Sequence, residues 1–110
     1  MTKPLRNSAP QDEVVAFLSS AKGHPGGGPV EVIQTHGAFV FLAGHIALKI
    51  KRAVQYDYMD LSTLELREQM IRRELALNQP VAPAIYHDVI AVTRDAEGHL
   101  RLGGTGKPVE

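Results

Sequence analysis

The chain has 110 residues, with 12 basic side chains, 12 acidic side chains and no cysteine. This length suffices for one small domain, the neutral balance argues against a dedicated nucleic-acid binder, and the lack of thiols excludes disulfides and thiolate metal sites. The sequence shows neither a signal peptide nor a stretch long and apolar enough to cross a membrane, so we expect a cytoplasmic protein without a membrane partner.

Residues 1–29 are predicted to form a short helix followed by a connector. The helix is expected at about residues 11–20, with Ser8 as a possible N-cap and Pro10 in its first turn. Its apolar side comprises Val14, Val15, Phe17 and Leu18. Residues 23–29 consist almost entirely of glycine and proline, which predicts a flexible loop. A phosphate-binding loop is rejected there, because no Gly-Lys-Ser/Thr follows.

Three strands are predicted next, over residues 30–36, 38–43 and 46–51. Gly37 marks the first turn and the pair Gly44-His45 marks the second. Side chains alternate between the two faces of a strand. One face of the third strand therefore carries Ile46, Leu48 and Ile50, and the other carries Ala47, Lys49 and Lys51. A small residue two positions before a lysine leaves room for a flat ligand, with the ammonium group beyond it.

The main helix is predicted over about residues 61–78. Ser62 and Glu65 have the spacing of a capping box, and Pro80 ends the helix. On a wheel of about 100° per residue, the apolar side chains form two stripes. One stripe contains Leu66, Met70 and Leu77, and the other contains Leu64, Ile71 and Leu75.

Glu74 falls between these two stripes, so its carboxylate is expected to face the buried side of the helix. A carboxylate in that position is costly unless it is paired, and Lys49 needs a partner for the same reason. Two alternatives stay open. Glu74 could instead pair with Arg67 or Arg73 on the helix, and Lys51 is a rival to Lys49 on the same strand face.

Two further strands are predicted over residues 85–93 and 99–102, followed by a glycine-rich turn at 103–108. The five histidines show no spacing typical of metal ligands, so no metal site is predicted. The expected fold is α+β, with an antiparallel sheet of about five strands. The 61–78 helix should cover the face that carries Ala47 and Lys49, and the 11–20 helix the opposite face.

Seven short motifs follow one another in a characteristic order along the chain. They are VIQTH at 32–36, VFLAG at 40–44, LKIK at 48–51, LSTLE at 61–65, ELALN at 74–78, APAIY at 82–86 and LRLGG at 100–104. Together they resemble the N-terminal lobe of a protein-kinase-like domain of the aminoglycoside phosphotransferase-like branch. More narrowly, they are similar to the N-terminal end of bacterial proteins that join such a domain to a P-loop ATPase domain.

The resemblance implies roles for four residues. Lys49 would contact the α- and β-phosphates of ATP, and Glu74 would hold Lys49 in place. Ala47 would lie against the adenine. The turn at Gly37 would occupy the place of the glycine-rich loop, although Gly-x-Gly-x-x-Gly is absent here.

The catalytic and magnesium-binding residues of kinases lie in a second lobe, which the resemblance places after this chain. Residues 30–110 would then be a partial domain, inactive alone. The full-length parent would use ATP and Mg²⁺ to phosphorylate a hydroxyl acceptor. The implied partners are the nucleotide, the second lobe and an attached P-loop ATPase domain, and the uncovered cleft face favours self-association. The alternative function is a degenerate kinase-like interaction or regulatory module.

Overall fold

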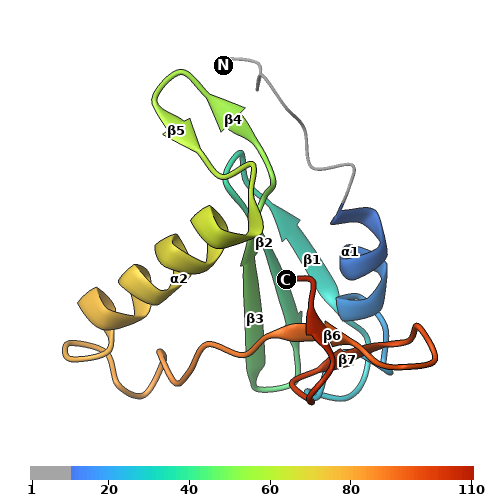
Figure 1. Cartoon of the computed structure of the whole chain (residues 1–110). Helices are drawn as coiled ribbons and strands as arrows, with labels where there is room; N and C mark the ends of the chain where they lie inside the picture. The colour runs from blue at the N-terminus through green and yellow to red at the C-terminus, as the bar shows by residue number, and fades with distance from the viewer. Residues whose placement is uncertain (1–10) are drawn as a thin grey trace.

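A computed structural model describes residues 11–110 and shows an α+β fold with antiparallel sheets and, within those residues, two helices (Figure 1). The predicted N-cap Ser8 and first-turn Pro10 lie outside the described residues. In chain order, the elements are α1 (Asp12–Leu18), β1 (Glu31–Gln34), β2 (Ala38–Ala43), β3 (Ile46–Lys51), β4 (Gln55–Tyr56), β5 (Met59–Asp60), α2 (Leu64–Asn78), β6 (Val92–Arg94), β7 (Leu100–Leu102) and β8 (Lys107–Pro108).

The strands of the described region form three small sheets, so the prediction of one sheet of about five strands is wrong. The first sheet has the order β1-β2-β3, the second is the β4-β5 ribbon, and the third has the order β7-β6-β8. The β4-β5 ribbon lies between the predicted third strand and the predicted main helix, where the sequence analysis predicted no strand. The third sheet gains β8 from the tail that was expected to be only a turn.

The β2-β3 hairpin has the predicted bounds, and its turn explains the Gly-His pair. Ala43 pairs with Ile46, which leaves Gly44 and His45 as a two-residue turn. Gly44 has φ +55°, a left-handed conformation that glycine adopts without steric cost. A Cβ there would also lie 2.5 Å from the carbonyl oxygen of Gly26, so no larger side chain fits.

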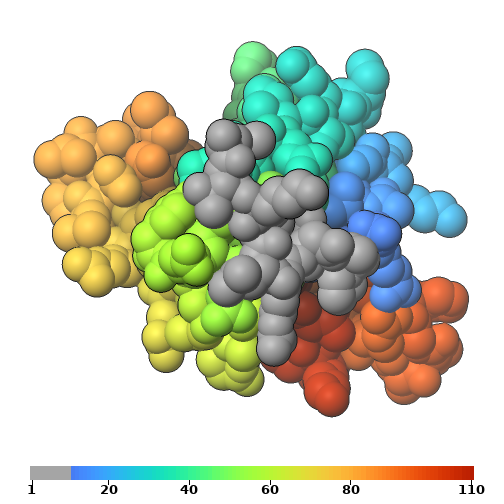
Figure 2. Space-filling model, turned by 90° about the horizontal axis from the view of Figure 1, so that it is seen from above, coloured from blue at the N-terminus to red at the C-terminus, as the bar shows by residue number. Residues whose placement is uncertain are grey.

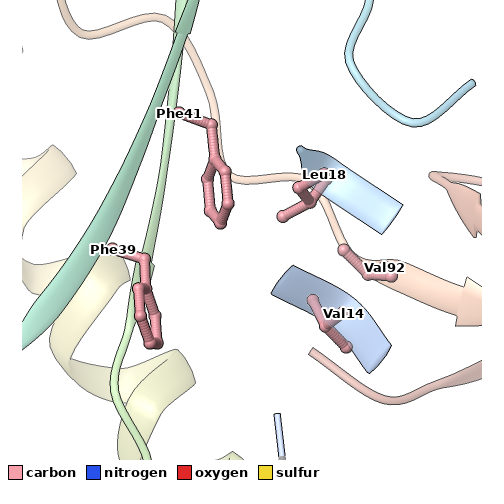
Figure 3. Packing of buried hydrophobic residues seen from close by; sticks show 5 residues of the cluster. All are labelled: Val14, Leu18, Phe39, Phe41 and Val92. Atoms are coloured by element: carbon pink, nitrogen blue, oxygen red, sulfur yellow. The ribbon is translucent and has the colours of Figure 1, made fainter. Parts of the chain in front are cut away.

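The hydrophobic core lies between α1 and one face of the first sheet. Phe41 from β2 and Leu18 from α1 are almost completely buried, and their side chains point toward one another (Figure 3). Val14, Phe39 and Val92 complete the buried cluster, and Leu48 and Ile50 of β3 pack against it. The expected position of the first helix over this face is therefore correct for Leu48 and Ile50, whereas Ile46 is exposed. Because α1 supplies this core, residues 11–18 pack as part of the same unit as the sheet.

The glycine-rich loop after α1 is packed in its first half, which corrects the expectation of a flexible connector. His24 is buried, and its Nε2 donates to the Phe41 carbonyl at 2.9 Å while its Nδ1 accepts from the Gly26 N–H at 3.0 Å. A Cβ on Gly26 would lie 2.0 Å from the Ala43 carbonyl oxygen. The loop thus closes the turn end of the hairpin.

Helix α2 begins at Leu64, three residues later than predicted, and Thr63 caps it by accepting a hydrogen bond from the Leu66 N–H at 3.2 Å. The predicted capping box at Ser62 does not form, because the Ser62 hydroxyl donates to Asp60 at 2.6 Å. Helix α2 and the segment after it extend to one side of the molecule (Figure 2). Within residues 11–110, neither helix is long and apolar enough to span a lipid bilayer.

The predicted strand at residues 85–93 is wrong for most of its length, since only Val92 and Thr93 of that range belong to β6. The N–H groups of Ile85 and Tyr86 turn back to the Ala82 carbonyl instead. The carbonyls of Tyr86 and His87 accept from the Gln79 side chain, both at 3.1 Å. These backbone groups therefore have partners other than a neighbouring strand.

Candidate functional site

The carboxylate of Glu74 lies between two lysine side chains of β3. Lys49 Nζ donates a hydrogen bond to Glu74 Oε2 at 3.1 Å, and Lys51 Nζ donates one to Glu74 Oε1. One acidic side chain therefore pairs with both basic ones. The sequence left open whether Lys49 or Lys51 is the partner of Glu74, and in the structure both lysines are.

The alternation of β3 brings these side chains to the same face. Lys49 pairs with Val40 across the sheet, and Lys51 pairs with Ala38. Paired residues of antiparallel strands share a face, so the lysines stand on the surface opposite the α1 core. Helix α2 lies along this face, as the sequence predicted (Figure 1).

Ala47, the candidate adenine contact, lies two positions before Lys49 on the same face and pairs with Leu42. Ala47 is exposed, so the surface beside the lysine is uncovered in this chain. The side chains of Ala47 and Leu42 provide an apolar patch next to a positive charge, an arrangement that suits a flat ring carrying an anionic group.

Two opposing effects set the pKa of Glu74. Burial raises it, whereas the hydrogen bonds from Lys51 and Lys49 and their positive charges lower it, and the net result is a pKa below the ordinary value of 4.5. The ion pairs therefore contribute stability that is present above about pH 4.5 and is lost as the pH falls through the lowered pKa of the folded state.

We expect the Glu74 carboxyl carbon, followed by NMR, to titrate with a pKa below 4.5. In Lys51→Met the pKa should rise, because one hydrogen bond and one positive charge are removed. Glu13, whose pKa is lowered by its hydrogen bond to Arg94, serves as the control, since Lys51→Met leaves that partner in place. An unchanged Glu74 titration in Lys51→Met would contradict the paired geometry.

Gly37 lies in the β1-β2 turn, at the end of the sheet nearest Lys51, because Lys51 pairs with the following residue, Ala38. The turn is held firmly. Arg52 Nη1 donates to the carbonyls of Thr35 and His36, both at 3.0 Å, and the Arg52 N–H donates to the Gly37 carbonyl at 2.9 Å.

An aromatic cluster from the β4-β5 ribbon supports the same turn. The rings of Tyr56 and Tyr58 are stacked with centroids 5.4 Å apart, and the His36 ring meets the Tyr56 ring edge-on at 5.5 Å. In glycine-rich phosphate loops, in contrast, the glycines let backbone N–H groups approach the phosphates closely. The candidate site residue Gly37 is thus near the lysines, in a turn that is held by the Arg52 hydrogen bonds and by the aromatic cluster.

A second polar anchor of α2 was missed by the sequence reasoning. Arg67 is the buried residue of α2, and its Nε donates to Glu110 Oε2 at 2.8 Å. Arg67 precedes Glu74 by about two helical turns, so both residues face the sheet. That spacing was the available signal, but Arg67 was considered only as a surface partner for Glu74.

Gln11 connects the Arg67–Glu110 pair to β3. Its Oε1 accepts from the Ala53 N–H at 2.7 Å, and its Nε2 donates to the Lys51 carbonyl at 2.8 Å and to Glu110 Oε1 at 3.0 Å. Gln11 is buried, although a glutamine at the start of a predicted helix gives no sign of this. The backbone of Lys51 is thereby fixed from the α1 side.

An open cavity of about 830 Å³ lies elsewhere, between the end of α1 and the β6-β7 hairpin. Its lining includes Phe17, Lys22, His99 and Arg101, and none of the four predicted site residues. We place the candidate site at Glu74 and the lysines nevertheless, because there the charged side chains converge on one another and on an apolar patch.

Comparison with known proteins gives relatives in mycobacteria. The chain is 37% identical over 70 residues to an uncharacterized protein of Mycobacterium tuberculosis and equally to one of Mycobacterium bovis. The match covers 64% of this chain and 14% of each relative, so the chain spans only a small part of their length. Neither a protein-family model nor a solved structure matches the chain.

Proposed function

We propose that this chain is the nucleotide-binding part of a kinase-like N-terminal lobe, and that it binds the phosphates of ATP through Lys49. In the longer parent that this proposal requires, the γ-phosphate of ATP would pass to a hydroxyl group of a small molecule. The second lobe would supply the catalytic groups and the ligands of Mg²⁺. The acceptor is left unspecified, because the second lobe would select it.

The observation that carries the proposal is the ion pair between Lys49 of β3 and Glu74 of α2, with Ala47 two positions earlier on the same face. A strand lysine held by a helical glutamate is the arrangement by which kinases position a charge on the nucleotide phosphates. Phosphoryl transfer requires mainly orientation and charge neutralisation, which a positioned lysine provides.

The exposure of the two side chains also supports Lys49, rather than Lys51, as the residue that contacts the phosphates. The Lys49 side chain is 40% exposed, whereas that of Lys51 is 12% exposed. A ligand on this face can therefore reach the ammonium group of Lys49 without displacing other side chains. The match to only a small part of each mycobacterial relative agrees with a lobe that works within a longer protein.

Lys49→Met is expected to weaken the binding of ATP with Mg²⁺ by about 100-fold, since it removes one close charge–phosphate contact. The measurement is calorimetry on the polypeptide extended beyond Glu110 through the second lobe. Lys107→Met, which removes an exposed lysine of β8, is the matched control and should bind ATP as the unmodified protein does. Equal affinities for the two variants would refute the nucleotide role of Lys49.

The alternative is a degenerate kinase-like lobe that acts as an interaction or regulatory module. The braced β1-β2 turn and the missing glycine-rich motif favour it, because they leave phosphates with less backbone coverage. Exposed apolar side chains such as Leu77, Val81 and Ile85 would serve such a module as a contact surface. If the extended protein fails to bind ATP at all, this alternative replaces the nucleotide-binding proposal.

A further inference from the structure

We propose that the two lysines divide the work at this site: Lys51 is the positioning residue that holds Glu74 and helix α2, and it thereby leaves the charge of Lys49 free for a phosphate. The part concerning the phosphate rests on the nucleotide-binding function proposed above. The part concerning the helix rests on the contacts of this chain alone.

The surroundings of Lys51 suit an anchor. Its side chain is 12% exposed, and its carbonyl accepts a hydrogen bond from the buried Gln11 side chain at 2.8 Å. Strand pairing with the buried Ala38 fixes the backbone at the same point. Lys51 therefore presents its ammonium group to Glu74 from a backbone that is restrained on two sides.

The surroundings of Lys49 suit a ligand contact instead. Its side chain is 40% exposed, and in the described part of the chain Glu74 is the acidic group that it meets. A long, exposed lysine side chain can leave one partner for another at little cost, because its ammonium group is already largely hydrated. An incoming phosphate can thus share the ammonium group of Lys49 while Lys51 satisfies Glu74.

The charges of the three groups support this division. Two ammonium groups face one carboxylate, so the cluster keeps an excess of one positive charge when Glu74 is ionised. The lowered pKa of Glu74 keeps it ionised at neutral pH. With a single lysine, the carboxylate would cancel the charge that a phosphate needs. The second lysine satisfies the carboxylate and preserves the excess.

Helix α2 depends on this anchor because it has little apolar contact with the sheet. Arg67 is its buried residue, Met70 and Leu77 of one predicted apolar stripe are exposed, and Leu64, Ile71 and Leu75 of the other are only half-buried. Toward the C-terminal end of the helix, the ion pairs of Glu74 with the lysines connect α2 to β3. Removal of the better-fixed lysine should therefore release this end of the helix.

The first test is hydrogen exchange on the 110-residue chain without any ligand. In Lys51→Met the amide protection of the second half of α2 should fall about tenfold, as for the loss of a partly buried ion pair. Lys49→Met, the same substitution two residues earlier, should leave that protection nearly unchanged. Lys51→Arg, which keeps the charge, should restore it. Greater loss in Lys49→Met than in Lys51→Met would overturn the division.

The second test is ATP affinity in the extended protein. Lys51→Met should bind about tenfold more weakly, since the cluster loses its excess charge. Lys51→Met with Glu74→Gln restores that excess and should recover most of the affinity, which a purely structural role of Lys51 would not allow. No recovery in the double variant would refute the charge argument. Unchanged ATP binding in Lys49→Met would refute the proposed function, while the exchange experiment would still decide the role of Lys51.

Discussion

Arg67→Met is expected to lower the free energy of unfolding by about 3–5 kcal/mol, because it leaves the Glu110 carboxylate buried without its charged partner. The side chains of this pair are 10% and 6% exposed, so little water is available to replace the lost contact. Arg67 also donates to the Leu61 carbonyl at 3.1 Å, and that acceptor loses its donor as well. Chemical denaturation followed by circular dichroism measures the change.

The same helix offers a matched control. Arg72 pairs with Glu68 one turn earlier, with side chains that are 60% and 53% exposed. Arg72→Met should cost about 0.3–0.5 kcal/mol, the usual value of an exposed pair on a helix. Replacement of both Arg67 and Glu110 by apolar residues should recover much of the loss, since no buried charge is then left alone. Equal effects of Arg67→Met and Arg72→Met would contradict the buried anchor.

Leu18→Ala is expected to cost about 2–5 kcal/mol, since it removes buried methyl groups and leaves a cavity beside Phe41. Leu18 is 1% exposed and lies at the centre of the cluster between α1 and β2. A domain of this size is typically stable by about 5–15 kcal/mol, so the loss would be a large share of the total. Thermal and urea unfolding of the purified variant provide the measurement.

Leu77→Ala makes the same chemical change near the end of the other helix. Leu77 is 65% exposed, so its truncation should change the free energy of unfolding by less than about 0.5 kcal/mol. A large effect at Leu77 would mean that α2 buries its apolar stripe after all. A small effect at Leu18 would mean that the core is not where the structure places it.

The sequence predicted best those elements whose stability is local. The β2-β3 hairpin was obtained with its bounds, because an alternating apolar pattern on either side of Gly44 has one simple register. The strand expected at residues 85–93 failed, because apolar composition cannot reveal that Gln79 takes the Tyr86 and His87 carbonyls. The division into three sheets was missed because each sheet pairs strands that are close in the chain, and β4, β5 and β8 are only two residues long, too short to show an alternating pattern.

At the site, the sequence indicated which residues share a face but could not reveal how the charges are distributed among them. Helical periodicity brought Glu74 to the strand, and strand alternation brought Lys49 and Lys51 to one surface. The strand pattern shows neither the unequal burial of the two lysines nor the contact of the distant Gln11 with the Lys51 backbone. The Arg67–Glu110 pair was missed for the same reason, because its two members lie far apart along the chain.

The two attachments of α2 respond differently to ionic strength. The side chains of the Arg67–Glu110 pair are 10% and 6% exposed, whereas those of the Lys51–Glu74 pair, which holds the other end of the helix, are 12% and 25% exposed. Dissolved ions screen the interaction between solvent-exposed charges, with a Debye length of about 8 Å at physiological ionic strength. They affect buried pairs much less. We therefore expect added salt to loosen the C-terminal end of α2 before its N-terminal end.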